Sequence, residues 1–169
     1  MSAHFPHQPY IDAVMVAISD IAAPGGSLDY EHEGDRIVME AVIPLADEVV
    51  EPDTGATSRT VLRWRQHEGW RYAVRWSDID GPDEPEELIT AKVPVPEALA
   101  LAAWRASTNC GPLPLEATET PASAEPLPAQ LAEAVQAGDL TAAMAAQLAH
   151  YPAVVLWEAP ANDDGARSW

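Results

Sequence analysis

The sequence predicts an α+β fold: an antiparallel sheet of four or five strands with two helices on one face, and a C-terminal helical element after a proline-rich linker. Two observations predict the sheet, because apolar and polar residues alternate over 28–43 and again over 59–76, and a glycine-containing turn interrupts each run. A third observation predicts the helices, since apolar residues recur at helical spacing over 11–21 and again within 97–106.

The composition divides the chain of 169 residues into four parts. Residues 1–107 form the α+β domain, a usual size for one unit. Residues 108–128 hold five prolines among Ala, Ser, Thr and Glu, which predicts an extended, semi-rigid linker. Residues 129–158 form a small helical element with too few apolar residues for a core of its own. Residues 159–169 form a flexible tail.

The first helix is predicted to begin at Pro9, because proline is tolerated at the first helical position. Ile11, Val14 and Ile18 then recur at helical spacing, and the Pro-Gly-Gly sequence at 24–26 ends the helix.

Two strands, 28–33 and 36–43, follow the first helix. Gly34 and Asp35 between them suit a two-residue turn with glycine first. This turn pairs Glu33 with Arg36 and keeps the apolar faces of both strands together, so turn chemistry and hydrophobic pattern agree on the register.

The second hairpin follows an acidic loop at 46–58 and contains five of the nine basic residues, all between 59 and 75. A three-residue loop at 67–69, with Gly69 in the left-handed conformation, pairs Trp64 with Tyr72 and Arg65 with Arg71. This register gathers the arginines on one face. On the other face it buries four residues: Leu62, Trp64, Tyr72 and Val74.

After a strongly acidic loop at 77–87, a short strand is predicted at 88–93 and a second helix at 97–106, with Leu101 and Trp104 facing inward. Beyond the linker, two short helices are predicted at 129–137 and 140–150. Gly138 stops the first of these and Asp139 caps the second. The apolar run at 153–157 requires burial against the main domain or a partner.

The net charge of −18 excludes several kinds of partner. It repels nucleic-acid phosphates and anionic lipid, so direct nucleic-acid binding would depend on the second hairpin alone. No apolar run approaches the ~18 residues that a membrane span requires. A single cysteine forms no internal disulfide, and the chain has no Lys or Arg before Arg36, so a reducing cytoplasm is the expected location.

Three segments carry a resemblance: 9–14 (PYIDAV), 61–70 (VLRWRQHEGW) and 93–99 (VPVPEAL). They resemble a family of small uncharacterised actinobacterial proteins whose members show a Trp, a few polar residues, then Glu-Gly-Trp, and later a Pro-x-Pro-Glu helix start. The resemblance covers about residues 9–105. The family has no assigned activity, so it implies no catalytic or binding residues here.

Few residues suggest catalysis, and we predict no catalytic residue, no metal and no cofactor. Cys110 is a lone loop cysteine without a recognisable histidine spacing, so a nucleophilic role is disfavoured. His4 at the third position after Met1 could help an N-terminal amine bind Cu(II) or Ni(II), but with His7 it belongs to no zinc-like set. The sequence has no glycine-rich phosphate loop, no Gly-x-Ser-x-Gly elbow and no His-Glu-x-x-His motif.

The candidate interaction residues are Arg63, Arg65, Arg71 and Arg75. They either neutralise acids on the first hairpin within the sheet or form a docking surface for an acidic partner. The acids concerned are Asp29, Glu31, Glu33 and Glu40. The aromatic stripe on the opposite face, formed by Trp64, Trp70, Tyr72 and Trp76, could stack nucleic-acid bases but is expected to be core.

The leading functional hypothesis is a non-catalytic acidic interaction protein, an adaptor or chaperone-like module, whose partner is another protein of unknown identity. One alternative is a nucleic-acid mimic or interference protein that acts through its acidic surface. Another is an enzyme of unrecognised class, which would require a deep pocket that gathers Cys110 or a histidine with carboxylates.

Overall fold

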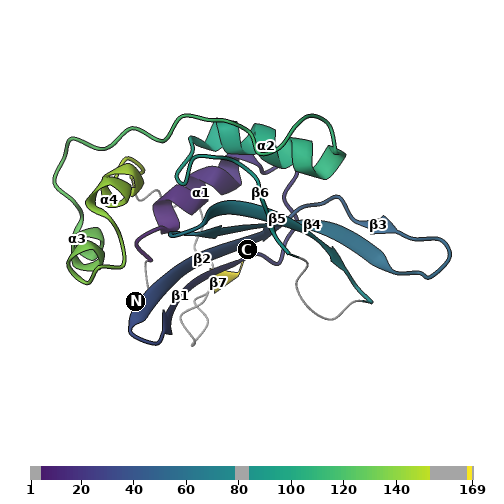
Figure 1. Ribbon diagram of the computed structural model, residues 1–169, viewed down its shortest axis with the longest axis horizontal. Coiled ribbons are helices and arrows are strands. Elements are labelled where there is room, and N and C mark those ends of the chain that lie inside the picture. The colour runs from purple at the N-terminus through teal and green to yellow at the C-terminus, as the bar shows by residue number, and fades with distance from the viewer. Residues whose placement is uncertain (1–4, 79–83, 153–166, 169) are drawn as a thin grey trace.

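The computed structural model describes residues 5–78, 84–152 and 167–168 (Figure 1). In chain order its elements are α1 (Gln8–Ala17), β1 (Ser27–Glu33), β2 (Arg36–Pro44), β3 (Val49–Val50), β4 (Thr57–Arg65), β5 (Gly69–Trp76), β6 (Glu86–Glu87), α2 (Pro96–Thr108), α3 (Ala129–Gln136), α4 (Ala142–Leu148) and β7 (Arg167–Ser168). The strands form one antiparallel sheet in the order β6-β5-β4-β2-β1-β7, with β3 paired to β4 outside this path. Helices α1 and α2 lie over one face of the sheet, which confirms the predicted α+β class.

The first hairpin has the predicted register. Glu33 pairs with Arg36 and Tyr30 with Met39, and Gly34 has a φ of +66° in the turn. Leu28, Met39 and Ala41 are fully buried beneath the helices. The prediction is confirmed because a two-residue turn and a buried face each allow only one pairing.

The second hairpin has a different register from the predicted one. Trp64 pairs with Trp70 instead of Tyr72, and Arg71 lies opposite Arg63 instead of Arg65. The turn is Gln66 to Glu68, closed by a hydrogen bond of 3.1 Å from the Glu68 amide to the Arg65 carbonyl. Side chains alternate with a period of two, so this shift of two residues leaves every residue on its predicted face. Leu62 and Trp64 are buried as predicted, but Tyr72 is only half-buried and Val74 is 39% exposed, because they lie toward the end of β5 away from the helices.

Contacts outside the hairpin favour the observed register. Gln66 is almost fully buried, and its side-chain amide bonds to strand β2, where it accepts from the Met39 amide at 2.8 Å and donates to the Ile37 carbonyl at 2.6 Å. Gly69 keeps the expected left-handed φ of +76°. A Cβ at this position would lie 3.3 Å from the Lys92 Cα, so a larger residue would have to displace the Lys92 backbone by a few tenths of an ångström in addition to adopting the left-handed conformation.

The two tryptophans that this register makes neighbours form the centre of the core. The Trp64 indole donates to the Lys92 carbonyl at 2.8 Å, and the Trp70 indole donates to the Tyr10 hydroxyl at 3.0 Å. The Tyr10 hydroxyl in turn donates to the Pro94 carbonyl at 3.0 Å. Both rings are therefore fully buried with their polar atoms satisfied.

Two details of the helices differ from prediction. Helix α1 contains a proline in its first turn as expected, but it ends at Ala17, because the chain turns to form a bridge between Ala22 and Leu45. Helix α2 does not direct Leu101 and Trp104 inward, since their exposures are 45% and 44%. It buries Leu99 and two alanines instead, and small residues allow α1 and α2 to pack closely.

The 88–93 segment is not a strand. Strand β6 lies just before it, and the segment itself forms a single bridge to the proline-rich stretch, from Ile89 to Leu115. Pro94, the next residue after the segment, forms a second bridge, to Glu119. The proline-rich stretch is extended as its composition predicts, and it is hydrogen-bonded along the main domain.

Helices α3 and α4 contribute to the same buried cluster as the sheet through Leu131 and Leu148, and the turn between them contributes Leu140. Gly138 follows the end of α3 and has a left-handed φ of +80°, as predicted for the residue that stops this helix. Asp139, by contrast, does not cap α4. The Thr141 hydroxyl is the cap, and the Asp139 carboxylate accepts from the Ile37 amide of β2 at 3.1 Å.

The predicted division of the chain into a domain at 1–107 and a separate element at 129–158 stays a prediction. Thermal unfolding of a chain truncated after Ala106 tests it. The shared cluster favours a single cooperative unit. The apolar run 153–157 lies outside the described residues, as does most of the 159–169 tail. Within that tail, β7 pairs with β1. None of the helices among the described residues is long and apolar enough to cross a bilayer.

Candidate interaction face

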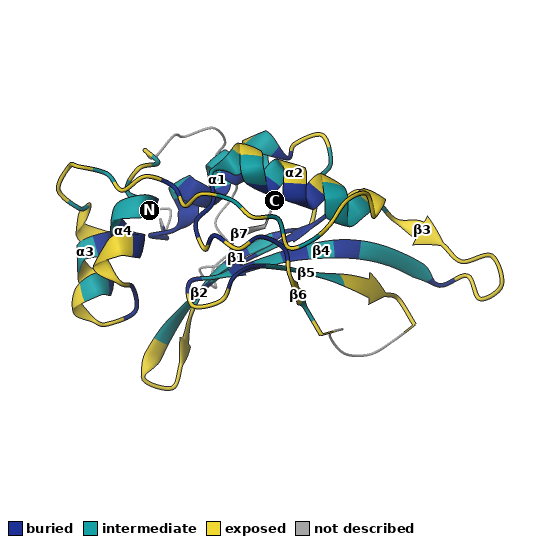
Figure 2. Cartoon of the chain, turned by 45° about the horizontal axis from the view of Figure 1, so that its top comes forward, coloured by how far each residue is buried: buried dark blue, intermediate teal, exposed yellow. Residues whose placement is uncertain are grey.

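The four candidate arginines lie on the sheet face opposite the helices. Arg63 and Arg65 come from β4, and Arg71 and Arg75 from β5. They occupy odd-numbered positions of the two strands, whereas the even-numbered Leu62, Trp64 and Trp70 are buried. Figure 2 shows α1 and α2 over the sheet and buried stretches of β4 on the side of these helices. We call these four residues the arginine face. Arg59 extends the face along β4, opposite Arg75.

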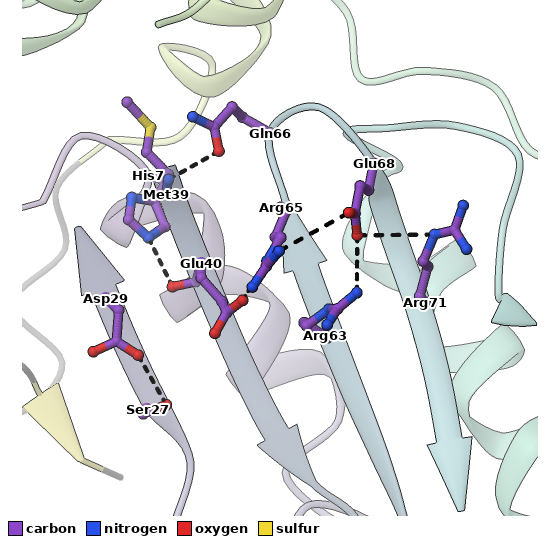
Figure 3. Close-up of polar contacts among 10 residues, drawn as sticks. All are labelled: His7, Ser27, Asp29, Met39, Glu40, Arg63, Arg65, Gln66, Glu68 and Arg71. Carbon is purple, nitrogen blue, oxygen red and sulfur yellow. Dashed lines mark hydrogen bonds and ion pairs between the residues drawn. The ribbon is translucent and has the colours of Figure 1, made fainter. Parts of the chain in front are cut away.

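One carboxylate serves three of these guanidinium groups. The Glu68 Oε2 lies 2.9 Å from the Arg63 Nη2 and 3.9 Å from the Arg71 Nε, and its Oε1 lies 4.0 Å from the Arg65 Nη1 (Figure 3). Arginines directly opposed on neighbouring strands repel each other, so Glu68 stabilises the pairing of Arg63 with Arg71. The sequence held a signal for this contact, because a turn residue lies within reach of both strands that it joins.

Glu40 of β2 is the second counter-ion. It is the cross-strand partner of Arg65, and its carboxylate accepts a hydrogen bond from the Arg65 Nε. Burial alone would lower the pKa of Arg65, but the hydrogen bond and charge of Glu40 outweigh burial and raise it. Of the four acids expected to neutralise the arginines, Glu40 is the one with an ion pair to them among the described residues, while Asp29 accepts from the Ser27 hydroxyl.

The arginines exceed the carboxylates that pair with them. Arg59 pairs with Glu48 at 2.9 Å, whereas Arg75 has no ion pair within the described residues. Among the described residues, the buried Nε atoms of Arg59, Arg63 and Arg71 donate a hydrogen bond to no acceptor. The face therefore keeps both positive charge and hydrogen-bond donors beyond those that its own acids use.

A small hollow of about 30 Å³ lies among these arginines. Its floor is apolar, formed by Val42, Val61 and Ala73, and Arg63, Arg71 and Arg75 stand around it. The structure thus brings three of the four candidates together around one hollow. Arg65 lies beside it, paired with Glu40. Guanidinium groups around an apolar floor suit a carboxylate carried on an apolar stem.

The aromatic stripe is core only in part. Trp64 and Trp70 are fully buried as expected, Tyr72 is half-buried, and Trp76 is 37% exposed at the end of β5. The Tyr72 hydroxyl donates to the Glu86 carboxylate at 2.9 Å. Buried indoles cannot stack nucleic-acid bases, which removes the central members of the stripe from that role.

The other candidate residues are dispersed. Cys110 is exposed, and His4 lies outside the described residues. His7 is fully buried against Trp64, with ring centroids 5.5 Å apart. Burial lowers the pKa of His7 to about 4, although its hydrogen bond to the Glu40 carbonyl acts in the opposite direction. His7 is therefore a neutral core histidine at physiological pH.

A larger cavity of about 230 Å³ lies between the second hairpin turn and α4. Its acids are Glu119 and Asp139. The Glu119 carboxylate accepts from the backbone amides of Lys92 and Val93, and the Asp139 carboxylate from that of Ile37. These carboxylates join separate segments of the chain. Across the described residues, no group of three or more His, Cys, Asp or Glu could hold a metal ion.

The comparisons with known proteins give no relative: no family model, no curated protein and no solved structure matches this chain. The resemblance to an actinobacterial family therefore stays a prediction.

Proposed function

We propose that this protein is a non-catalytic interaction module that docks an acidic segment of another protein on its arginine face. The observation that carries the proposal is the surplus of guanidinium donors, with Arg75 unpaired within the described residues and the Nε atoms of Arg63 and Arg71 buried without acceptors. A carboxylate from a partner would pair with the exposed Arg75 guanidinium and with the accessible terminal nitrogens of its neighbours. Charge-assisted hydrogen bonds of this kind are stronger than neutral ones.

The large negative charge of the chain is compatible with an acidic partner. At physiological ionic strength the Debye length is about 8 Å, so acids elsewhere on the surface are screened more than the arginines in contact. Long-range attraction is consequently absent, and binding depends on short-range contacts. We expect slow association, because the chain as a whole and its acidic partner both carry negative net charge, and electrostatic steering speeds encounter only when the interacting charges are opposite.

A charge reversal with a matched control tests the proposal. Arg71 donates to the Pro85 carbonyl at 3.1 Å, and Arg105 of α2 donates to the Pro112 carbonyl at 3.2 Å on the other side of the sheet. Arg71→Glu and Arg105→Glu therefore change the net charge equally and each remove one similar hydrogen bond.

The probe is a labelled peptide of about eight residues with alternating Glu and Val, a length typical of one strand. We expect Arg71→Glu to weaken its binding at least about tenfold, or about 1.4 kcal/mol, and Arg105→Glu to change it less than about twofold. Equal losses in both variants would assign the effect to net charge and overturn the proposal.

A further inference from the structure

We propose that the cavity between the second hairpin turn and α4 binds a small zwitterion, namely a free amino acid with an aliphatic side chain. The inference goes beyond the proposed function, because none of the four residues of the arginine face lines this cavity. Helices α3 and α4 lie together at one end of the molecule (Figure 1). The residues that line the cavity all belong to the described part of the chain.

The first argument is the size of the cavity and its access to solvent. Its volume is about 230 Å³. A cavity of about 150 Å³ holds a benzene molecule, whereas drug-sized ligands require about 300 Å³ or more. Two of the lining residues, His67 and Lys92, are exposed, so a ligand can enter from solvent. A molecule the size of one amino acid fits these limits.

The second argument is an unpaired cation. Lys92 lines the cavity, and its ammonium group forms no ion pair with the described residues. The Lys92 backbone is fixed on both sides, because its amide donates to the Glu119 carboxylate at 2.8 Å and its carbonyl accepts from the Trp64 indole at 2.8 Å. The side chain therefore extends from a fixed point, and its ammonium group can pair with the carboxylate of a ligand.

The third argument is a buried carboxylate that is only partly used. Asp139 is 5% exposed, and its Oδ1 accepts from the Ile37 amide at 3.1 Å. Its Oδ2 accepts no hydrogen bond within the part of the chain that the structure describes. A carboxylate has about four acceptor sites, and leaving them unused in a buried group costs free energy. The ammonium group of a ligand would supply donors to this oxygen.

The other acid of the cavity is already occupied by the protein. The Glu119 carboxylate accepts from two backbone amides at 2.8 and 3.0 Å and from the Gln147 side chain at 3.1 Å. Lys92 and Asp139 thus contribute opposite charges to one cavity, yet among the described residues they form no ion pair with each other. A ligand that carries both charges can pair with both, and a free amino acid is such a ligand.

The fourth argument is the apolar part of the lining. Leu140 and Met144 line the cavity and are buried. An aliphatic side chain of the ligand would bury apolar area against them, and methionine adapts its shape to what it contacts. This surface favours an aliphatic amino acid over one with a polar side chain.

Ligands with a single charge are poorer occupants. An inorganic anion would pair with Lys92 but would also meet the carboxylates of Glu119 and Asp139. A simple amine would pair with Asp139 and meet the Lys92 ammonium group. An end of a peptide chain carries only one of the two charges. Each of these ligands leaves a charge in the cavity unpaired or opposed, which lowers its affinity.

An NMR titration with L-leucine tests the inference on the unaltered protein. Isoamylamine, which is leucine without its carboxylate, and isocaproic acid, which is leucine without its ammonium group, are the matched controls. We expect L-leucine to bind at least about tenfold more tightly than either fragment, because only leucine pairs with both charges. The backbone amide signals that shift most should be those of residues in the lining, Lys92, Asp139 and Met144 among them.

Two variants test the two charged groups. Lys92→Met keeps the backbone bonds of this residue, and Asp139→Asn keeps an oxygen for the Ile37 amide. Each should weaken L-leucine binding at least about tenfold. Arg36→Met and Asp35→Asn make the same changes of charge at exposed positions of the first hairpin, and each should change the affinity less than about twofold.

The fragments also show which group pairs with which charge. Lys92→Met should spare isoamylamine, which has no carboxylate, and Asp139→Asn should spare isocaproic acid, which has no ammonium group. Equal losses of L-leucine affinity in these variants and in the controls at Arg36 and Asp35 would overturn the site. If L-leucine bound the wild type no better than its fragments, the inference would be wrong whether or not the variants fold.

Discussion

The two faces of the β4–β5 hairpin have the same backbone geometry and opposite chemistry. The helix-covered face holds Trp64 and Trp70, fully buried with their indole N–H groups satisfied. The other face holds half-buried arginines that share Glu68, and its hydrogen-bond donors exceed its own acceptors. Alternation along a strand thus assigns stability to one face and leaves the other free for contacts. Mutations on the two faces are expected to have effects of very different size.

The largest expected effect is on the buried face. Trp64→Ala should reduce the free energy of unfolding by about 3–5 kcal/mol, because it leaves a cavity and the Lys92 carbonyl without its donor. Denaturant unfolding measures the change. Trp76→Ala is the control, and its partly exposed ring should matter far less. A loss within about 0.5 kcal/mol for Trp64→Ala would contradict the burial of this face.

Acid should weaken the same face through His7, which packs on Trp64. Its pKa is about 4 in the folded protein and about 6.5 when unfolded, so the unfolded chain binds the proton first as the pH falls. The stability from neutral His7 is complete above about pH 6.5 and is lost between pH 6.5 and 4. The total loss should be roughly 3 kcal/mol.

His7→Gln removes this titration, and urea unfolding at a series of pH values compares the two proteins. The slope of the free energy of unfolding against pH should be smaller in the variant between pH 6.5 and 4. Parallel curves for both proteins would mean that His7 is not the group responsible.

The hairpin turn should give an intermediate effect. Gln66→Ala leaves the Met39 amide and the Ile37 carbonyl without their side-chain partner, which should cost about 1–3 kcal/mol. His67→Ala, at the exposed neighbouring position in the same turn, should change stability by less than about 0.5 kcal/mol. Equal effects in thermal or denaturant melts would exclude a role of Gln66 in fixing the register.

The smallest expected effect is on the arginine face. Arg63→Ala removes a partly exposed ion pair with Glu68, which is worth about 0–1 kcal/mol. The loss should shrink further in high salt, because salt screens exposed charges. A loss above about 2 kcal/mol would show that this face contributes to the core instead of remaining available for binding.

The faces of the second hairpin could be predicted from sequence, but its register could not. Alternation over 59–76 separates arginines from aromatics, and this separation survives any shift of two residues. The register depends on Gln66 bonding to β2 and on Gly69 passing beneath Lys92, both contacts between segments distant in sequence. The first hairpin lacks this ambiguity, since its two-residue turn allows one pairing.

The buried face of α2 could not be predicted from sequence for a similar reason, since it depends on a contact with a distant segment. Apolar size suggested that Leu101 and Trp104 face inward, yet the helix buries its alanines, since α1 lies close to it. The candidate arginines could be located by charge alone. The position of Glu68 in the turn between their strands was the signal for a contact, but the sequence does not show that one carboxylate lies near three of them, because that depends on the folded geometry of the turn.

Strand β2 extends past the end of β4, and there its backbone amides and carbonyls form hydrogen bonds with side chains instead of with a neighbouring strand. The Gln66 amide bonds to Met39 and Ile37 on the β4 side, and the Asp139 carboxylate accepts from the Ile37 amide. Gln66 and Asp139 therefore cover this end of β2, and we expect them to oppose aggregation, because an uncovered strand edge readily pairs with another molecule. Loss of either side chain would leave backbone groups of β2 unpaired and open to pairing with another copy, in a protein whose net negative charge otherwise opposes self-association.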